Sequence, residues 1–259
     1  VQVGRLRALA ERTDMNDKAL QAFLDGGGAH GGDKRKHVAP YAGISSFLRA
    51  PIQDGFNDLD IALLGVPFDL AVTNRPGTRF GPGQVRDLSV LAAGPKHHVS
   101  GIIPAAIARY ADCGDVPIAS TFNLDQATQE IEDFYHTVVD ARVIPLSLGG
   151  DHSISYPILK AVGRDQPVGM IHIDAHADTG DDYGGSRFHH GAPFKVAVDE
   201  GLLDPKRTAQ IGIRGTLYNP DMWKFSYDSG MRVMLMEEVE EMGGMTKAVA
   251  SGMPKLRIE

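Results

Sequence analysis

The sequence predicts an α/β protein with three layers, in which helices cover both faces of a mostly parallel central sheet. Short, mostly apolar segments are predicted strands: residues 60–67, 107–115, 143–148, 171–173, 208–214 and 231–236. Continuous apolar runs are typical of strands that are covered on both faces. Helical segments alternate with the strands, which implies parallel strands joined by right-handed crossovers.

The remaining elements follow in chain order. Helices are predicted at residues 82–91, 124–142 and 156–162, and a Gly- and Pro-rich loop at residues 68–83 precedes the first of them. Residues 1–24 predict one or two short helices, and the Gly- and His-rich residues 25–36 a surface loop, with an accessory metal site at His30 and His37 as the less favoured alternative. We expect a single domain over residues 1–259, with residues 1–40 as an N-terminal arm.

Composition excludes several classes of partner. The chain has 259 residues, 42% of them hydrophobic, which suits one α/β domain. A formal net charge of −7 argues against a nucleic-acid partner, and no apolar run approaches the roughly 20 residues that span a bilayer. Cys113 is the only cysteine, so an intramolecular disulfide is excluded. This agrees with a reducing compartment, and we expect a cytoplasmic protein.

Residues 171–179 (IHIDAHADT) carry the first chemical signal. The segment begins as a buried strand, and residues two apart on a strand point to the same face. Asp174, His176 and Asp178 are therefore expected to converge just past a strand end. Two carboxylates and an imidazole suit a hard or borderline divalent cation such as Mn2+ better than a structural zinc ion held by thiolates.

A second predicted strand ends in residues 149–153 (GGDHS). Its glycines allow a sharp turn, and His152 follows at the carboxyl end of the strand, where open α/β sheets place their sites. Asp151 could orient a ligand histidine or stabilise the turn. His172 shares the parity of Asp174 but lies between isoleucines, so we expect a hydrogen-bonded core histidine there.

Four segments in this order resemble the ureohydrolase family of arginases, agmatinases and guanidinobutyrases: residues 74–82 (NRPGTRFGP), 149–153 (GGDHS), 174–178 (DAHAD) and 188–194 (FHHGAPF). The similarity runs from about residue 40 to residue 242, and its loops are closer to the agmatinase or guanidinobutyrase types. It implies an arginase-like fold, a small guanidino substrate such as agmatine or guanidinobutyrate, and a homo-oligomer, either a trimer or a hexamer.

The resemblance also implies the roles of individual residues. His152 and Asp178 would bind one ion, His176 the other, and Asp174 would bridge both and so take part in catalysis. The implied ions are a Mn2+ pair, with Ni2+ or another divalent ion as alternatives. Water between two such cations would lose a proton near neutral pH, and the hydroxide would attack the guanidinium carbon to release urea and an amine.

The loop residues have implied roles as well. The histidine at the position of His190 lies over the metal site in the family, where it would shuttle protons or bind substrate, against the alternative of a solvated loop histidine. Its neighbour His189 is the less favoured choice. Asp181 or Asp182 could hold the cationic tail of a substrate, although solvated loop charges are the default. Arg79 is expected to anchor its loop rather than to touch a cationic substrate.

The family's third metal motif, Ser-x-Asp-x-Asp-x-x-Asp-Pro, has no match here. Two carboxylates for two dications would leave an excess formal charge of about +2, which is costly to bury. We therefore expect that a C-terminal part of a longer protein is missing, and that activity depends on the missing ligands. A non-catalytic ureohydrolase-like subunit is the alternative, and a metal hydrolase acting on acetylated amines is a weaker one.

Overall fold

The computed structural model describes residues 39, 41–92, 96–98, 101–217 and 220–252. The predicted N-terminal helices and the loop with His30 and His37 lie outside these residues. The chain divides into two compact units, which are described separately below. The first comprises Val1–Asp69, Gly77–Pro117 and His136–Gly150, and the second Leu70–Pro76, Ile118–Tyr135 and Asp151–Glu259. The expectation of one domain therefore stays a prediction.

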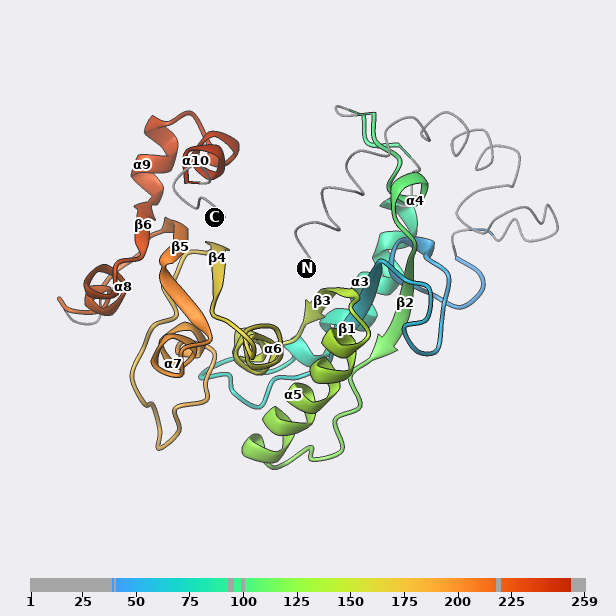
Figure 1. Cartoon of the computed structure of the whole chain (residues 1–259), viewed down its shortest axis with the longest axis horizontal. Coiled ribbons are helices and arrows are strands. Elements are labelled where there is room, and N and C mark those ends of the chain that lie inside the picture. The colour runs from blue at the N-terminus through green and yellow to red at the C-terminus, as the bar shows by residue number, and fades with distance from the viewer. Residues whose placement is uncertain (1–38, 40, 93–95, 99–100, 218–219, 253–259) are drawn as a thin grey trace. The chain divides into compact units, whose positions relative to one another are not determined.

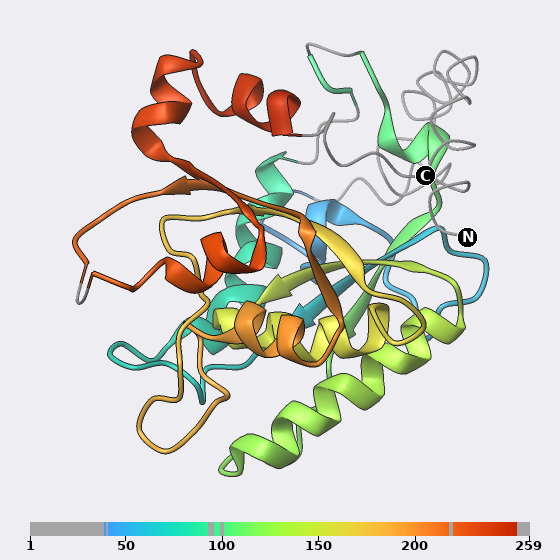
Figure 2. The ribbon, with the colours of Figure 1, turned by 60° about the vertical axis from the view of Figure 1, so that its left-hand side comes forward.

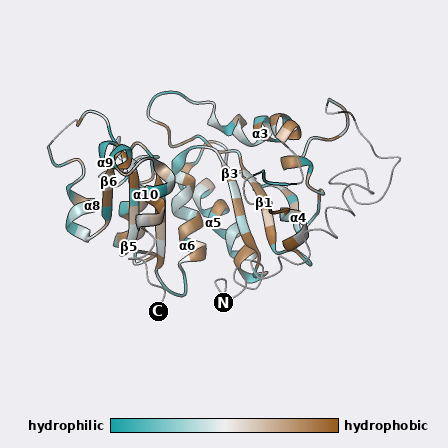
Figure 3. Ribbon diagram, turned by 90° about the horizontal axis from the view of Figure 1, so that it is seen from above, coloured by the Kyte–Doolittle hydropathy of each residue, from teal (hydrophilic) through white to brown (hydrophobic). Residues whose placement is uncertain are grey.

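The first unit contains a three-stranded parallel sheet with the order β2-β1-β3 (Figure 1). The central strand β1 is buried at five of its six positions and is coloured as hydrophobic along most of its length in Figure 3, as expected for a strand covered on both faces. The elements are η3 (Phe47–Arg49), β1 (Ile61–Val66), η4 (Thr78–Phe80), α3 (Gly81–Ser89), η5 (Val90–Ala92), α4 (Pro104–Ile107), β2 (Tyr110–Asp115) and β3 (Ile144–Gly149).

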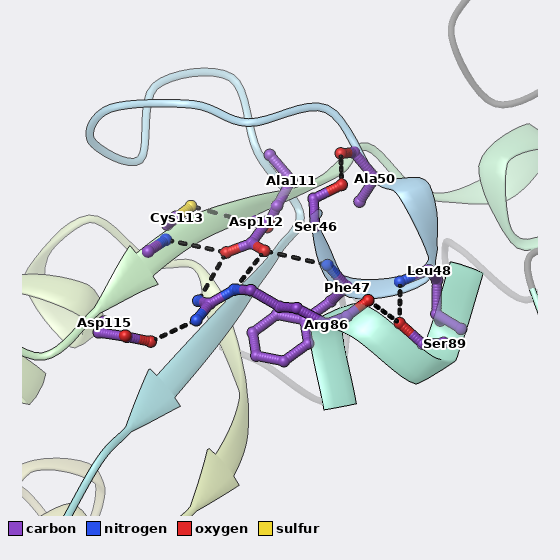
Figure 4. Close-up of polar contacts among 11 residues, drawn as sticks. Ser46, Phe47, Leu48, Ala50, Arg86, Ser89, Ala111, Asp112, Cys113 and Asp115 are labelled. Carbon is purple, nitrogen blue, oxygen red and sulfur yellow. Dashed lines mark hydrogen bonds and ion pairs between the residues drawn. The ribbon is translucent and has the colours of Figure 1, made fainter. Parts of the chain in front are cut away.

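A buried ion-pair network holds η3 and α3 to β2 in this unit (Figure 4). Asp112 is 2% exposed and accepts hydrogen bonds from the backbone N–H groups of Phe47 and Gly114, each at 3.0 Å. The guanidinium of Arg86 donates to Asp112 at 2.8 and 3.0 Å and to Asp115 at 2.6 Å, and it lies 4.1 Å from the centre of the Phe47 ring. Every oxygen of the buried carboxylate is therefore paired.

The second unit contains another three-stranded parallel sheet, with the order β4-β5-β6 (Figure 2). Helices cover both of its faces: one core joins β5 and β6 to α9 and α10, and the other joins α6 and α7 to the opposite face. The elements are η6 (His152–Ile154), α6 (Ser155–Val162), β4 (Val168–Ile173), α7 (Pro193–Asp199), β5 (Leu203–Ile213), α8 (Lys224–Ser229), β6 (Arg232–Leu235), α9 (Met236–Glu241) and α10 (Met245–Gly252). Helix α5 (Leu124–Asp140) contributes residues to both units.

The α/β class with parallel strands is confirmed, because all four strand pairs of the described residues are parallel. The helices predicted at residues 82–91, 124–142 and 156–162 are α3, α5 and α6. The described strands form two hydrogen-bonded sheets rather than one continuous sheet. Among the described residues, no helix combines the length and apolar character that a membrane crossing needs.

Candidate metal centre

Four polar side chains of the second unit meet at the carboxyl end of β4. One ligand atom from each of His152, His172, Asp174 and Asp178 lies within 4.8 Å of all the others. Nδ1 of His152 is 2.6 Å from Oδ2 of Asp178 and 3.3 Å from Oδ2 of Asp174. The structure therefore brings together three of the four residues expected to bind metal.

A capped turn presents His152. Asp151 is the N-cap of η6, and its Oδ1 accepts hydrogen bonds from the backbone N–H of Ser153, at 2.8 Å, and from the Ser153 hydroxyl. Its Oδ2 accepts the backbone N–H of Ala71 at 3.1 Å. Of the two roles considered for Asp151, these contacts support turn stabilisation, and they also fix the segment of residues 70–76.

A bend in the chain, not strand alternation, brings Asp174 and Asp178 together. β4 ends at Ile173, so the period-two argument does not extend to the residues beyond it. The backbone N–H of Asp174 still donates to the carbonyl of Ile211 at 3.1 Å, which keeps the first carboxylate beside β5. Asp178 has φ of 50°, in the left-handed region that non-glycine residues seldom adopt. The sequence predicted the convergence of these carboxylates, but for a different geometric reason.

The two histidines of this segment differ in position. The side chain of His176 is 67% exposed, and its Nδ1 is 3.9 Å from Oδ1 of Asp174. Its backbone N–H donates to the same oxygen at 3.0 Å. His172 is 5% exposed, with Nε2 3.3 Å from Oδ2 of Asp174, as expected for a hydrogen-bonded core histidine. Metal binding by His176 stays a prediction, and it would require the His176 ring to turn towards the group.

An aromatic ring from α7 packs against both His152 and His172. The ring of Phe194 lies 4.5 Å from that of His172 and 5.4 Å from that of His152, measured between centroids. The backbone N–H of Phe194 donates to the carbonyl of Asp178 at 3.2 Å. Helix α7 therefore begins beside residues 174–178, which we call the metal loop. The Phe194 ring therefore forms an apolar wall on one side of the group.

The electrostatic environment favours the ionised form of Asp174 and the protonated form of His152. Burial by itself lowers the pKa of His152, but the hydrogen bond to Asp178 and the negative charges nearby outweigh it, so this pKa is raised. Burial by itself raises the pKa of Asp174, but the backbone N–H of His176 and the neighbouring histidines outweigh it, so this pKa is lowered. Burial, with a contribution from nearby His152, lowers the pKa of His172.

The donor set fits a divalent cation. Asp174 and Asp178 together carry two negative charges, which balance one such ion, and the imidazole of His152 adds a nitrogen donor. Carboxylate oxygens with imidazole nitrogen suit Mn2+ and related ions. The side chains are partly or largely buried, with exposed fractions of 33% for His152, 25% for Asp174 and 8% for Asp178, unlike a solvated acidic surface.

The loop after the metal segment presents His190 to residues 70–76. The backbone N–H of His190 donates to the Ala71 carbonyl at 3.1 Å, and its Nε2 is 2.9 Å from the hydroxyl oxygen of Thr73. His189 instead uses both ring nitrogens within its own loop: Nε2 is 2.9 Å from the Asp181 carbonyl, and Nδ1 accepts the N–H of Gly191 at 3.2 Å. These contacts favour His190 over His189 as the residue available for chemistry.

Hydrogen bonds to Glu200 and stacking of Tyr156 on Phe188 anchor the loop that carries His189 and His190. The hydroxyl of Tyr156 donates to Oε2 of Glu200 at 2.8 Å, and Nη2 of Arg187 donates to Oε1 of the same residue at 2.8 Å. The rings of Tyr156 and Phe188 stack with centroids 5.3 Å apart. Burial, then the hydrogen bond to Glu200, raises the pKa of Tyr156, so its hydroxyl stays a donor.

Asp181 and Asp182, the two residues considered for binding the cationic tail of a substrate, lie on the surface of the same loop. The side chain of Asp181 is 89% exposed and forms an ion pair with Lys195, whose Nζ is 2.7 Å from Oδ1. The hydrogen bond to Asp181 raises the pKa of Lys195. Asp182 is exposed.

In the first unit, Nε of Arg79 donates to Asp69 at 2.5 Å, so Arg79 anchors its loop as the sequence predicts.

The sequence did not identify Thr73, Tyr156, Glu200 or Gln210. Gln210 is fully buried beneath the metal loop, and its Nε2 is 2.6 Å from the Ala177 carbonyl. A lone amide inside the apolar residues 209–213 was the only signal that could have drawn attention to it. Thr73 carried no such signal, because its partner is far away in the sequence.

Comparison with known proteins places this site in context. A model described as the arginase family matches residues 59–255. Guanidinopropionase of Pseudomonas aeruginosa is 48% identical over 207 residues, which cover 80% of this chain and 64% of that protein. Proclavaminate amidinohydrolase of Streptomyces clavuligerus has a similar structure, with a TM-score of 0.77 and 31% identity over 85% of this chain and 72% of that chain.

A structure of Trypanosoma cruzi formiminoglutamase with Mn2+ is also similar, with a TM-score of 0.69 and 25% identity over 77% of this chain and 67% of that chain. Further curated relatives are agmatinases, guanidino acid hydrolases and a guanidinobutyrase. The chain spans less than two thirds of the length of these curated relatives, at 64%, 59% and 57% for the guanidinopropionase, an agmatinase and a guanidino acid hydrolase.

Proposed function

The chain belongs to the arginase family, and we propose from that premise that it hydrolyses a linear guanidino compound to urea and an amine with a divalent metal ion. The observation that carries the proposal is the convergence of His152, Asp174 and Asp178 within 4.8 Å. The donor chemistry and the Mn2+ of a related structure support Mn2+ as the ion. His176 is proposed as a further ligand.

The residues of the chain divide the chemistry between them. His152, Asp174 and Asp178 would hold the ion, which supplies a nucleophile from water at neutral pH and so overcomes the low reactivity of the guanidinium carbon. The amine product leaves only after its nitrogen gains a proton, and His190 is proposed to carry that proton at Nδ1, because Thr73 contacts its Nε2. Thr73 would fix the His190 ring through its hydroxyl, 2.9 Å away.

Among guanidino compounds, we propose a guanidino carboxylic acid as the preferred substrate over agmatine. The negative charge of Asp181 is already compensated by Lys195, so a cationic substrate tail gains little from that carboxylate. The 48% identity to a guanidinopropionase supports the same choice. Asp182 stays the alternative partner for a cationic tail. A cytoplasmic location and a homo-oligomer remain expectations from the sequence.

The test is urea release from agmatine, guanidinopropionate, guanidinobutyrate and arginine, with bound metal quantified on the same preparation. Asp178→Asn is expected to abolish both metal binding and urea release. Asp228→Asn, which removes an exposed carboxylate on α8, is the matched control and is expected to change neither. Absence of urea from every compound, with less than one metal ion per chain, would overturn the proposal in favour of a non-catalytic subunit.

A further inference from the structure

Gln210 lies directly beneath the proposed metal loop. It is fully buried on β5 and pairs with His172 on β4 in the parallel ladder. Its amide nitrogen Nε2 is 2.6 Å from the carbonyl oxygen of Ala177 and 3.3 Å from Nδ1 of His172. The two N–H bonds of one amide group therefore face two acceptors, one in the metal loop and one on a histidine of the group.

The Ala177 carbonyl fixes the orientation of this amide. A carbonyl oxygen can only accept, so the Gln210 atom that lies 2.6 Å from it must be the N–H2 group. Exchanging the amide oxygen and nitrogen would bring two oxygens into contact. The fold keeps this orientation although Oε1 of Gln210 has no hydrogen-bond partner among the described residues, an arrangement that costs about 1–3 kcal/mol.

This orientation determines which nitrogen of His172 carries the proton. Because Nε2 of Gln210 donates, Nδ1 of the neutral His172 ring must accept. The proton then lies on Nε2 of His172, which is 3.3 Å from Oδ2 of Asp174 and donates to it. A ring nitrogen that carries a proton cannot bind a metal ion. His172 is therefore a partner of Asp174 and not a ligand, despite its place in the group.

We propose that Gln210 is a positioning residue that selects this tautomer of His172, and so orients the Asp174 carboxylate for metal binding. The proposal rests on the metal site proposed above. The second hydrogen bond of Gln210, to Ala177, holds the loop between His176 and Asp178 at the same time. One buried amide thus acts on both carboxylates of the group, on Asp174 through His172 and on Asp178 through the loop backbone.

The first measurement is calorimetric titration of the metal-free chain with Mn2+. Gln210→Met keeps the length and burial of the side chain and removes both donors. Partners of metal ligands typically contribute a factor of about 10–100 to metal affinity, and we expect a loss of this size. Thr208→Val is the matched control, because Thr208 is 1% exposed on the same strand and donates to the Asp204 carbonyl at 2.8 Å. Its Mn2+ affinity is expected to stay unchanged.

The second measurement reads the tautomer directly. In the metal-free chain with 15N-labelled histidine, two-bond 15N–1H correlations distinguish protonated from bare ring nitrogens. The His172 signals are assigned by their loss in His172→Phe. We expect Nε2 protonated at neutral pH in the wild type and in Thr208→Val. In Gln210→Met only the Asp174 contact still favours this tautomer, so we expect a fraction of His172 protonated on Nδ1 to become detectable.

Two results would overturn the inference: protonation of His172 on Nδ1 in the wild type, or full Mn2+ affinity in Gln210→Met. Neither readout uses urea release. If the wild-type chain binds no Mn2+, the proposed function fails, and the His172 tautomer still decides whether Gln210 acts as described.

Discussion

The hydroxyl oxygen of Thr73 lies 2.9 Å from Nε2 of His190, although 116 residues separate them in the chain. The backbone of the same segment accepts the N–H of His190 through Ala71. Ala71 in turn donates to Asp151, the N-cap residue that presents His152. One short segment therefore connects the proposed proton carrier to the turn of a proposed metal ligand.

Thr73→Val is expected to lower kcat and leave KM unchanged. The substitution keeps the shape of the side chain but removes a hydrogen bond worth about 0.5–1.5 kcal/mol, which corresponds to a roughly twofold to thirteenfold slower reaction. Steady-state urea production measures both constants. Thr73→Ser should restore the rate, and Thr121→Val, at an exposed loop threonine, should have no effect. An equal rise in KM would contradict the role of Thr73 in orienting His190.

Mn2+ affinity is expected to fall as the pH is lowered. Without metal, the Asp178 contact raises the pKa of His152 above its ordinary value of 6.5, against the effect of burial. His152 must lose its proton before Nδ1 can bind an ion, so binding competes with protonation below the raised pKa. Calorimetry in buffers of different ionisation enthalpy should show proton release on binding that grows as the pH falls through this range. His152→Asn should reduce the pH-dependent part, and affinity that is constant with pH in the wild type would contradict the assignment.

Lys195→Met is expected to shift substrate preference towards cationic guanidino compounds. The substitution frees the Asp181 carboxylate, and an exposed pair of this kind contributes about 0.2–1 kcal/mol, so the shift should not exceed about fivefold. The measured quantity is kcat/KM for agmatine divided by kcat/KM for guanidinopropionate. Lys195→Met with Asp181→Asn should return this ratio to the wild-type value. A ratio that stays shifted in the double variant would place the effect elsewhere.

Arg86→Met is expected to destabilise the first unit strongly. It leaves the buried Asp112 carboxylate without its cation, a loss that typically costs about 3–5 kcal/mol (Figure 4). Asp115→Asn, which removes the more exposed partner of Arg86, should cost less than about 1 kcal/mol. Urea-induced unfolding followed by circular dichroism gives both values. Equal effects of the two substitutions would contradict the central position of Asp112.

The same carboxylate predicts acid sensitivity. Burial by itself raises the pKa of Asp112, but Arg86 and two backbone N–H groups outweigh it, so its pKa lies below the ordinary value of 3.8. Its contribution to stability is therefore present above that value and is lost as the pH falls through the lowered folded pKa. Asp112→Asn should show a smaller fall in unfolding free energy between neutral pH and about pH 3 than the wild type. An identical pH dependence would show that other carboxylates determine the acid response.

Much of the fold follows from local patterns. The apolar residues 60–67 predicted the strand Ile61–Val66, and the amphipathic residues 124–142 predicted the helix Leu124–Asp140. Such patterns report how one segment is buried, which is a local property. The helices α7 and α8, with seven and six residues, were not predicted because they are too short to show a helical period.

The sequence by itself determined the family and the parallel α/β class. It also predicted His152, Asp174, His176 and Asp178 as metal ligands, because these residues follow buried strands at the edge where such sites form. Only the tertiary structure decided that a bend in the chain joins the two carboxylates, that His172 and Gln210 lie beside them, and that Thr73 contacts His190. The physical reason is that these contacts join segments brought together by the pairing of β4 with β5 and by loop docking, and no local pattern records such partners.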